Sequence, residues 1–223
     1  MPSGFFPLLV LLLLVLLPLL FLNIVTVALT KLGINPVLGP TVMVLMFLGS
    51  LVNIPVFRER VDTPISRHPL DIWGMQRYMP HMQRQLTERI VAVNLGGFVI
   101  PMLLVVYELV RVWQSYPALL LPLAIAVLIN IVVCYWSAKP VPGVGIVMPA
   151  FVPGALAALS ALLLAPGMSP PVAYCAGVLG PVVGADLLHL NKIRNAQVGI
   201  ASIGGAGTFD GIVISGLLAV LLV

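Results

Sequence analysis

Long apolar stretches separated by shorter polar ones dominate the pattern of this chain. A helix that crosses the ~30 Å hydrocarbon core of a bilayer needs about 20 mostly apolar residues. Seven stretches meet this requirement, at residues 5–30, 36–57, 90–113, 117–136, 144–164, 171–190 and 200–223. The pattern therefore predicts an all-α fold, a polytopic transmembrane helix bundle that forms one domain over residues 1–223. The count becomes six or eight if a glycine- and proline-rich piece is re-entrant.

Composition indicates that lipid surrounds most of the chain. Hydrophobic residues make up 61% of the 223 and charged residues 8%, whereas a soluble globular domain carries about 25% charged residues. No polar stretch is long enough to enclose a core of its own, which excludes a sizeable soluble domain. The run from Met1 to Leu22 has no positively charged start and no small-residue cleavage site, so we expect a retained helix rather than a signal peptide.

The cationic residues predict the orientation in the membrane. Between the second and third spans lie six arginines: Arg58, Arg60, Arg67, Arg77, Arg84 and Arg89. In the seven-span arrangement Lys139, Lys192 and Arg194 fall on the same side, so that side holds nine of the eleven lysines and arginines. The other side holds Lys31 and Arg111. The positive-inside rule then predicts a prokaryotic inner-membrane protein with a cytoplasmic N-terminus and an external C-terminus.

The basic loop over Arg58–Arg89 is the largest polar region. Its second half, from Asp71, alternates aromatic and methionine residues with arginines, which fits an amphipathic helix at the headgroup level or a solvated connector equally well. The clustered charge also predicts contact with anionic lipid. Because the charge follows membrane topology, a nucleic-acid partner is not expected.

Asp210 is the most informative polar residue, since it follows a glycine-rich run inside the last apolar stretch. A carboxylate at membrane depth costs roughly 2.5–3.5 kcal/mol on insertion scales and usually faces a bundle interior or a wet cavity. The run predicts an unwound segment leading into a half-helix, with Thr208 as its N-cap. The alternative is close helix packing through the glycines, with Asp210 as a structural cap. The candidate binding residues of this segment are Gly204, Gly205, Gly207, Thr208 and Asp210.

A second aspartate, Asp186, lies near the end of the preceding apolar stretch, where it could pair with Lys192 or Arg194. His189 follows at a spacing of three, on the same face of an α-helix. Neither a zinc-protease motif nor a cysteine cluster accompanies them, so no metal and no cofactor are expected. Cys134 and Cys175 lie in apolar runs and are expected to be small buried hydrophobes.

Polar residues within the other spans complete the set of candidates. Asn94 begins a glycine-rich motif and is a candidate site residue, although interhelical hydrogen bonding explains it equally well. Glu108 and Arg111, three residues apart at a span end beside aromatic residues, predict an interfacial anchor.

Two aspartates on neighbouring membrane helices also suggest an intramembrane aspartyl protease. That chemistry needs two carboxylates roughly 3 Å apart that share one proton. The glycine-x-glycine-aspartate pattern typical of such proteases is absent, because Thr208 and Phe209 separate Gly207 from Asp210.

The chain resembles a family of uncharacterised prokaryotic multi-pass membrane proteins, a domain of unknown function. The resemblance rests on residues 94–101, 140–145, 184–188 and, above all, 201–212, which contain the sequence GGAGTFDG. It implies a compact multi-helix membrane domain and transfers no activity.

Three hypotheses about function remain open. The leading one is binding or translocation of a small solute or ion at a polar site around Asp186 and Asp210. The second is a membrane-embedded hydrolase that uses both aspartates as a catalytic dyad. The third is an accessory subunit of a larger membrane complex, or a homo-oligomer, in which the glycines serve packing alone.

Overall fold

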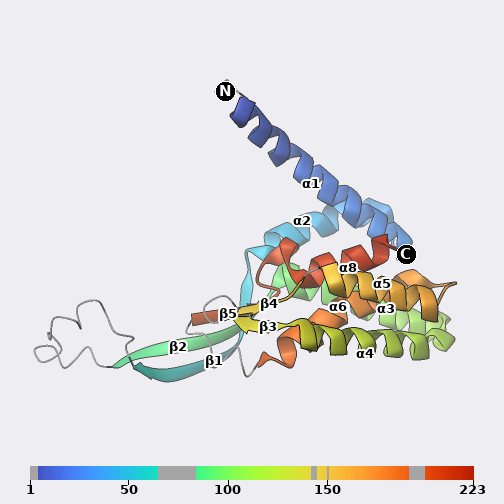
Figure 1. The fold of residues 1–223 in the computed structure, drawn as a ribbon. Helices are drawn as coiled ribbons and strands as arrows, with labels where there is room; N and C mark the ends of the chain where they lie inside the picture. The colour runs from blue at the N-terminus through green and yellow to red at the C-terminus, as the bar shows by residue number, and fades with distance from the viewer. Residues whose placement is uncertain (1–4, 65–83, 142–144, 150, 191–198) are drawn as a thin grey trace, which may run out of the picture.

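The computed structural model describes residues 5–64, 84–141, 145–149, 151–190 and 199–223, and in this part the chain is mostly helical (Figure 1). The α-helices are α1 (Phe5–Lys31), α2 (Gly39–Ser50), α3 (Ile100–Ser115), α4 (Leu120–Ser137), α5 (Phe151–Leu164), α6 (Ser169–Leu179) and α8 (Gly211–Leu221). Two π-helical segments, η5 (Leu95–Val99) and η7 (Gly180–Leu187), adjoin α3 and α6. Short 3-10 turns are η1 (Pro36–Leu38), η6 (Pro117–Leu119) and η8 (Gly207–Phe209).

Strands correct the expectation of an all-α fold. In one sheet, β1 (Asn53–Pro64) pairs antiparallel with β2 (Arg84–Asn94), which pairs parallel with β5 (Gly199–Ile203). A small antiparallel pair joins β3 (Lys139–Val141) to β4 (Gly145–Val147). The expectation was wrong because β1, β2 and β5 begin or end within runs that were assigned to helices by hydropathy. A short apolar run fits a buried strand as well as a helix, and Pro55 inside β1 disfavours a helix there.

The same correction shortens several predicted spans. By length and composition, three helical segments of the described chain can cross a membrane: Leu9–Lys31, Leu95–Ser115 and Pro117–Ser137. The helices at Pro36–Ser50, Phe151–Leu164 and Gly211–Leu221 are apolar but shorter. With its 12 residues, α2 covers about 18 Å at 1.5 Å per residue, well short of a bilayer core. The amphipathic helix considered for the basic loop lies largely outside the described residues, and Arg84–Arg89 belongs to β2.

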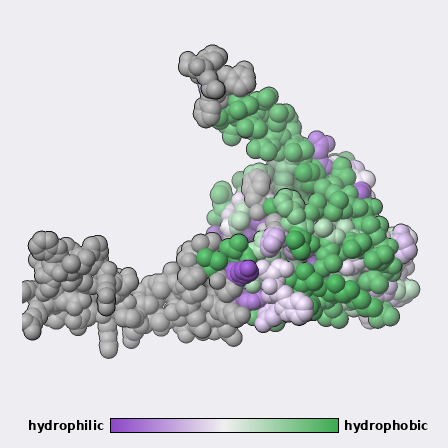
Figure 2. All heavy atoms as spheres, viewed as in Figure 1, coloured by the Kyte–Doolittle hydropathy of each residue, from purple (hydrophilic) through white to green (hydrophobic). Residues whose placement is uncertain are grey.

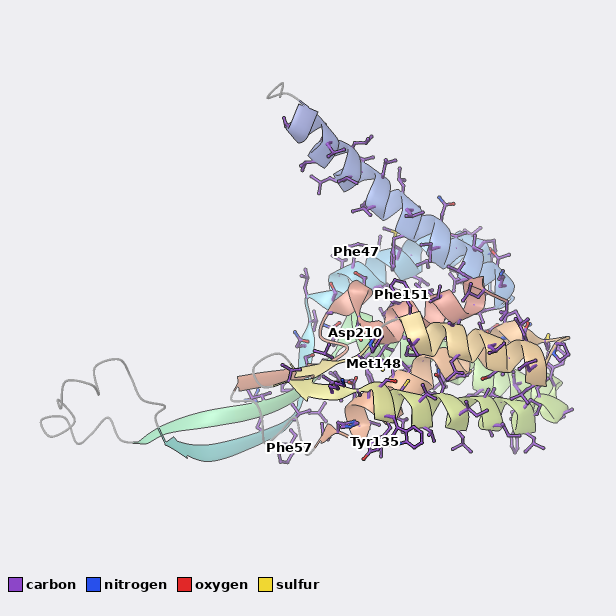
Figure 3. The ribbon with its side chains drawn as sticks, viewed as in Figure 1. Phe47, Phe57, Tyr135, Met148, Phe151 and Asp210 are labelled. Atoms are coloured by element: carbon purple, nitrogen blue, oxygen red, sulfur yellow. The ribbon has the colours of Figure 1, made fainter. Side chains whose placement is uncertain are left out.

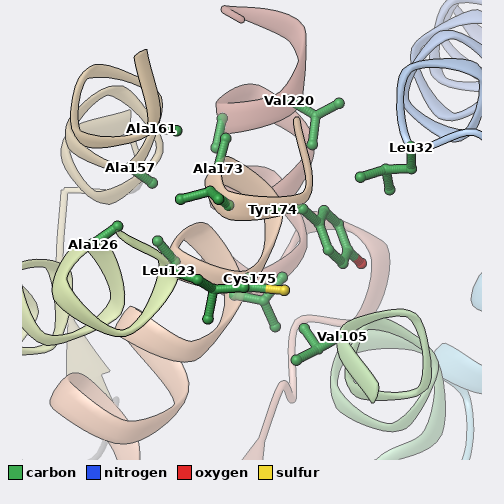
Figure 4. Close-up of a cluster of buried hydrophobic side chains, with 14 of the residues drawn as sticks. Leu32, Val105, Leu123, Ala126, Ala157, Ala161, Ala173, Tyr174, Cys175 and Val220 are labelled. Atoms are coloured by element: carbon green, nitrogen blue, oxygen red, sulfur yellow. The ribbon is translucent and has the colours of Figure 1, made fainter. Parts of the chain in front are cut away.

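Helix α6 forms the centre of the core, and its residues from Pro171 to Val178 are all buried. Small side chains surround it, among them Ala126 of α4 and Ala157 and Ala161 of α5 (Figure 4). A Cβ added to Gly177 would lie 2.9 Å from the carbonyl oxygen of Ser215, so α6 and α8 approach each other closely. Small residues at helix contacts are typical of membrane bundles, where association depends on close van der Waals packing. Cys134 and Cys175 are free and buried, as expected.

Apolar side chains cover most of the face of the helical body that Figure 2 shows. Exposed examples on α4 are Leu121, Leu128 and Trp136, with relative exposures of 70%, 61% and 77%. Helix α1 extends away from the body, and every leucine from Leu9 to Leu20 is exposed (Figure 1). Contiguous apolar surface of this size is unusual for a protein in water and compatible with a membrane protein.

Four basic residues of the described chain lie at two opposite ends of the helical body. Figure 1 shows the strands, which carry Arg58 and Lys139, at one end and the C-terminus at the other. At the C-terminal end, the Lys31 ammonium donates to the carbonyl oxygens of Val220 (3.2 Å) and Leu221 (3.0 Å). The Arg111 guanidinium lies at this end too, donating to the carbonyl of Leu32. We call the two regions the sheet end and the C-terminal end.

Candidate functional site

Three pieces of chain meet at the sheet end because β1, β2 and β5 are hydrogen-bonded neighbours. Strand β1 starts just after α2 ends, β2 leads directly into η5 and α3, and β5 leads through η8 into α8. The two glycine motifs of the sequence, at residues 94–97 and 204–207, fall at the last two of these junctions. The sheet therefore brings together motifs that lie more than a hundred positions apart in the chain.

Asn94 is fully buried and forms hydrogen bonds to residues at these junctions. Its amide nitrogen donates to the carbonyl oxygen of Ser50 (2.8 Å) and to Oδ1 of Asn53 (3.1 Å). Its Oδ1 accepts from the backbone N–H of Gly97 (2.8 Å), so Asn94 is the N-cap of η5. The hydroxyl of Ser202 on β5 donates to the same Asn53 oxygen (2.6 Å). These are the contacts of a structural cap, and a binding role for Asn94 stays a prediction.

The two glycine motifs pack against each other through their backbones. A Cβ on Gly97 would overlap the carbonyl oxygen of Gly204 and lie 2.8 Å from that of Gly207. Gly204 and Gly207 adopt φ angles of 70° and 63°, which side chains with a Cβ rarely adopt. A Cβ on Gly207 would also overlap Ser50 at the end of α2. Close backbone packing thus accounts for these glycines, as the packing alternative requires.

Asp210 lies where the last glycine motif becomes a helix (Figure 3). Its Oδ1 accepts from the N–H of Ile212 (3.0 Å) and its Oδ2 from the N–H of Ala206 (3.3 Å). Asp210 is therefore the N-cap of α8, and the expectation that Thr208 would cap it is wrong. Aspartate is the stronger N-cap of the two residue types, while Thr208 is buried within the turn before the helix. The predicted half-helix after an unwound segment is confirmed.

Asp186 comes from a second irregular element, the π-helical η7. Single π-helical turns are rare and occur frequently at functional sites. The Asp186 carboxyl is partly exposed and close enough to Asp210 and to Cys134 to interact with both electrostatically. Within the described chain it has no hydrogen bond or salt bridge, and the predicted partners Lys192 and Arg194 lie outside the described residues. The fold therefore brings the two aspartates near each other, one of them hydrogen-bonded to backbone and the other unpaired.

His189 is buried beside the end of η7. Its Nδ1 lies 3.2 Å from the carbonyl oxygen of Gly184 and 3.0 Å from that of Ala185. Since carbonyl oxygens only accept, Nδ1 carries the hydrogen in this arrangement. The ring stacks on Tyr135 of α4, with centroids 4.7 Å apart. In the described residues, no three His, Cys, Asp or Glu side chains gather as a metal site would require.

Sequence reasoning did not single out Ser50 and Ser202, which complete the hydrogen-bond cluster around Asn94 and Asn53. Both follow apolar runs and resemble ordinary turn residues in the sequence. A signal was available for Ser202, because it lies two residues before the glycine motif. Recognising its role required knowing that residues 199–203 form a strand beside β2.

The chain belongs to the family described as protein of unknown function (DUF1614), whose model matches residues 47–222. The match covers both glycine motifs and both aspartates. No curated protein and no solved structure matches the chain. The resemblance seen in the sequence is thus confirmed as far as a family of unknown function, and the family supplies no activity for the aspartates.

Proposed function

We propose that this protein is a multi-pass integral membrane protein that binds or translocates a small cation, a proton or a cationic solute at the Asp186–Asp210 site. One observation carries the proposal: two elements that contact each other, the π-helical η7 and helix α8, each carry an aspartate, Asp186 within η7 and Asp210 at the N-cap of α8. Irregular backbone at membrane depth is tolerated where it is buried in protein or lines a cavity. Discontinuous helices of this kind form the ion sites of many transporters.

The charge balance of the site favours a positive ligand. Two carboxylates near each other repel, and a cation or a proton between them relieves that repulsion. Asp210 already accepts two backbone hydrogen bonds, which fix its orientation. Asp186 has no such partner within the described chain, so its carboxylate is the one available to a ligand.

The topology proposed for this function is the one predicted from the sequence: seven crossings of the inner membrane, with the N-terminus in the cytoplasm and the C-terminus outside. The separation of Arg58 and Lys139 from Lys31 and Arg111, at opposite ends of the body, supports it. In this orientation the Arg58–Arg89 loop faces the cytoplasm, where it meets anionic lipid. Because α2 and α8 are short, the second and last crossings each combine a half-helix with extended chain.

An intramembrane aspartyl hydrolase is the second candidate, favoured by the interaction between Asp186 and Asp210. In a catalytic dyad the two carboxyl groups share one proton and activate water. The backbone hydrogen bonds to both oxygens of Asp210 oppose this role, because they leave that carboxylate fewer lone pairs for a shared proton.

The test uses the full chain in lipid nanodiscs. Thermal unfolding is measured in chloride salts of sodium, potassium, lithium, magnesium and choline, each over a range of pH. We expect one small cation, or acidification, to raise the unfolding temperature, because a ligand that binds the folded state stabilises it. Asp186→Asn removes the effect, and Asp186→Glu, which keeps the charge, retains part of it. If no cation or proton stabilises the wild type, or if Asp186→Asn responds like the wild type, the proposal is wrong.

A hydrolase is distinguished by incubating the same nanodiscs with labelled membrane-spanning peptides. Cleavage that requires both Asp186 and Asp210 would establish the dyad and displace the binding proposal. Cleavage that survives Asp186→Asn would exclude it. An accessory subunit would instead copurify with a fixed partner from its native membrane, independently of both aspartates.

A further inference from the structure

Glu108 on α3 lies apart from the Asp186–Asp210 site, near the C-terminal end of the bundle. The expectation that it anchors the protein at the membrane interface is wrong, because its side chain is fully buried, with a relative exposure of 0%. The neighbours of α3 cover it, since α3 packs on α6. A buried acidic side chain in a membrane helix is a candidate functional group.

The carboxyl of Glu108 is poorly satisfied. Neither Oε1 nor Oε2 has a hydrogen-bond partner among the described residues. The nearest opposite charge is the Arg111 guanidinium, whose Nη1 lies 3.5 Å from Oε2. This separation is longer than a good N–H···O hydrogen bond. Desolvating two charges costs several kcal/mol per ion in proteins, and a single long ion pair offsets that cost incompletely.

Arg111 is itself shared with another part of the chain. It donates to the carbonyl of Leu32 at the end of α1. Gly33, with a φ of 73°, leaves room for the guanidinium in the following turn, where a Cβ would lie 2.8 Å from Nη2. With 28% of its side chain exposed, Arg111 connects the buried carboxyl to the surface. The guanidinium is therefore held by a carbonyl of the α1 end as well as by the charge of Glu108.

The other ionisable groups near Glu108 offer no compensating charge. Tyr174 and Cys175 on α6 interact with it electrostatically, and both are neutral acids buried in the core. The Tyr174 hydroxyl already donates to the carbonyl oxygen of Pro101, at 3.4 Å. Lys31 lies at the same end of the bundle, and its ammonium donates to the last carbonyl oxygens of α8. Within the described chain, Arg111 is thus the one positive charge that contacts Glu108.

We propose that Glu108 is a second ion site of this protein and that its ligand is a proton. The proton comes from water at the C-terminal end, past Arg111, and binds to Oε1, the oxygen that does not face the guanidinium. The carboxylate becomes a neutral carboxylic acid, and no other bond is made or broken. A metal cation is disfavoured because it needs several ligands, and no group of three or more His, Cys, Asp or Glu side chains gathers among the described residues.

Infrared difference spectroscopy of the full chain in nanodiscs tests this site directly. The carbonyl stretch of a protonated carboxylic acid is recorded as the pH is lowered through the neutral range. Glutamate labelled with carbon-13 separates glutamic from aspartic acid bands. Besides Glu108 the chain has two glutamates, Glu59 and Glu88, both on the β1–β2 hairpin.

We expect a glutamic acid band that grows with acidification in the wild type and disappears in Glu108→Gln. Asp186→Asn and Asp210→Asn serve as matched controls and should leave it in place. Arg111→Gln removes the charge that stabilises the carboxylate, so its titration midpoint should rise by about one pH unit or more, a tenfold change in proton affinity. Arg111→Lys keeps the charge and should leave the midpoint near that of the wild type.

Two results would overturn the proposal. One is a wild type without a protonated glutamic acid band at neutral or mildly acidic pH, which would make Glu108 a permanent ion-pair partner of Arg111. The other is a band that persists in Glu108→Gln. If that variant fails to fold, the carbon-13 band in the wild type and the shift of its midpoint in Arg111→Gln, compared with Arg111→Lys, still decide the question. Both results are independent of whether the Asp186–Asp210 site binds a solute.

Discussion

The sheet end and the C-terminal end of the bundle satisfy their buried polar groups in different ways. At the sheet end Asn94, Asn53 and Ser202 form a closed hydrogen-bond cluster, and glycines let the backbones touch. At the C-terminal end Glu108 lacks a hydrogen-bond partner among the described residues, and two long cationic side chains hold the helix ends together. The first region is shaped by backbone geometry and the second by charge. Substitutions should therefore act on the first through sterics and lost hydrogen bonds, and on the second through pH and salt.

The largest effect is expected where the two glycine motifs touch. In Gly97→Ala the new methyl group would overlap backbone oxygens of Gly204 and Gly207, which cannot move aside as a flexible side chain could. Overpacking of this kind costs about 1–3 kcal/mol and occasionally more, and we expect the upper end. Thermal unfolding in nanodiscs measures it. Gly167→Ala is the control, because a Cβ there meets nothing within 4 Å. Equal stability of the two variants would refute close packing of the motifs.

The second largest effect is expected at Asn94. Replacement by alanine removes its two donated hydrogen bonds and the N-cap of η5, leaving the buried Gly97 N–H unsatisfied. Each buried unsatisfied group costs about 1–3 kcal/mol, so we expect a loss of about 2 kcal/mol in the free energy of unfolding. The exposed Asn23, which donates within its own helix, is the control, and Asn23→Ala should be close to neutral. A neutral Asn94→Ala would show that the cluster contributes little.

Asp210 offers a way to separate capping from charge. Asp210→Ala removes the N-cap of α8 and should cost about 1 kcal/mol, whereas asparagine caps a helix as well as aspartate does. We therefore expect Asp210→Asn to lose less stability than Asp210→Ala, because it can still accept from the Ile212 N–H and loses only the hydrogen bond from Ala206, while it changes any cation response. The comparison is made by unfolding both variants with and without the stabilising cation. If Asp210→Asn destabilises as much as Asp210→Ala, the second carboxylate oxygen, which accepts from Ala206, is as important to stability as the cap itself.

The smallest effect is expected at Lys31. Its ammonium caps the last carbonyls of α8, and a cation at a helix C-terminus contributes about 0.3–1 kcal/mol at low ionic strength. Lys31→Gln should lose this amount, and the difference from wild type should shrink as salt is added. Lys139→Gln, at an exposed position on β3, serves as the control. A loss that does not depend on salt would indicate packing of the lysine stem rather than its charge.

The sequence predicted the mostly helical character of the chain and its apolar surface, which is compatible with a membrane protein, because both follow from hydrophobic composition and the length of the apolar runs. It also predicted that the last apolar stretch is a broken element, since the glycines at 204, 205 and 207 disfavour a continuous helix. The predictions from the sequence were wrong at the ends of the apolar stretches. Residues 53–57 and 90–94 are as apolar as a membrane helix requires. They form strands because the two segments, distant in sequence, pair with each other in the fold.

The sequence by itself determined local properties of each segment. These are how apolar it is, where glycine and proline interrupt it, and how few acidic residues it carries. The tertiary structure alone decided which segments meet. It made Asp210 a cap, left Asp186 unpaired within the described chain, and buried Glu108, which lies close in sequence to the exposed Tyr107 and Trp113. The physical reason is that hydrogen bonds and electrostatic fields act over a few ångströms, and only folding sets distances between residues far apart in the chain.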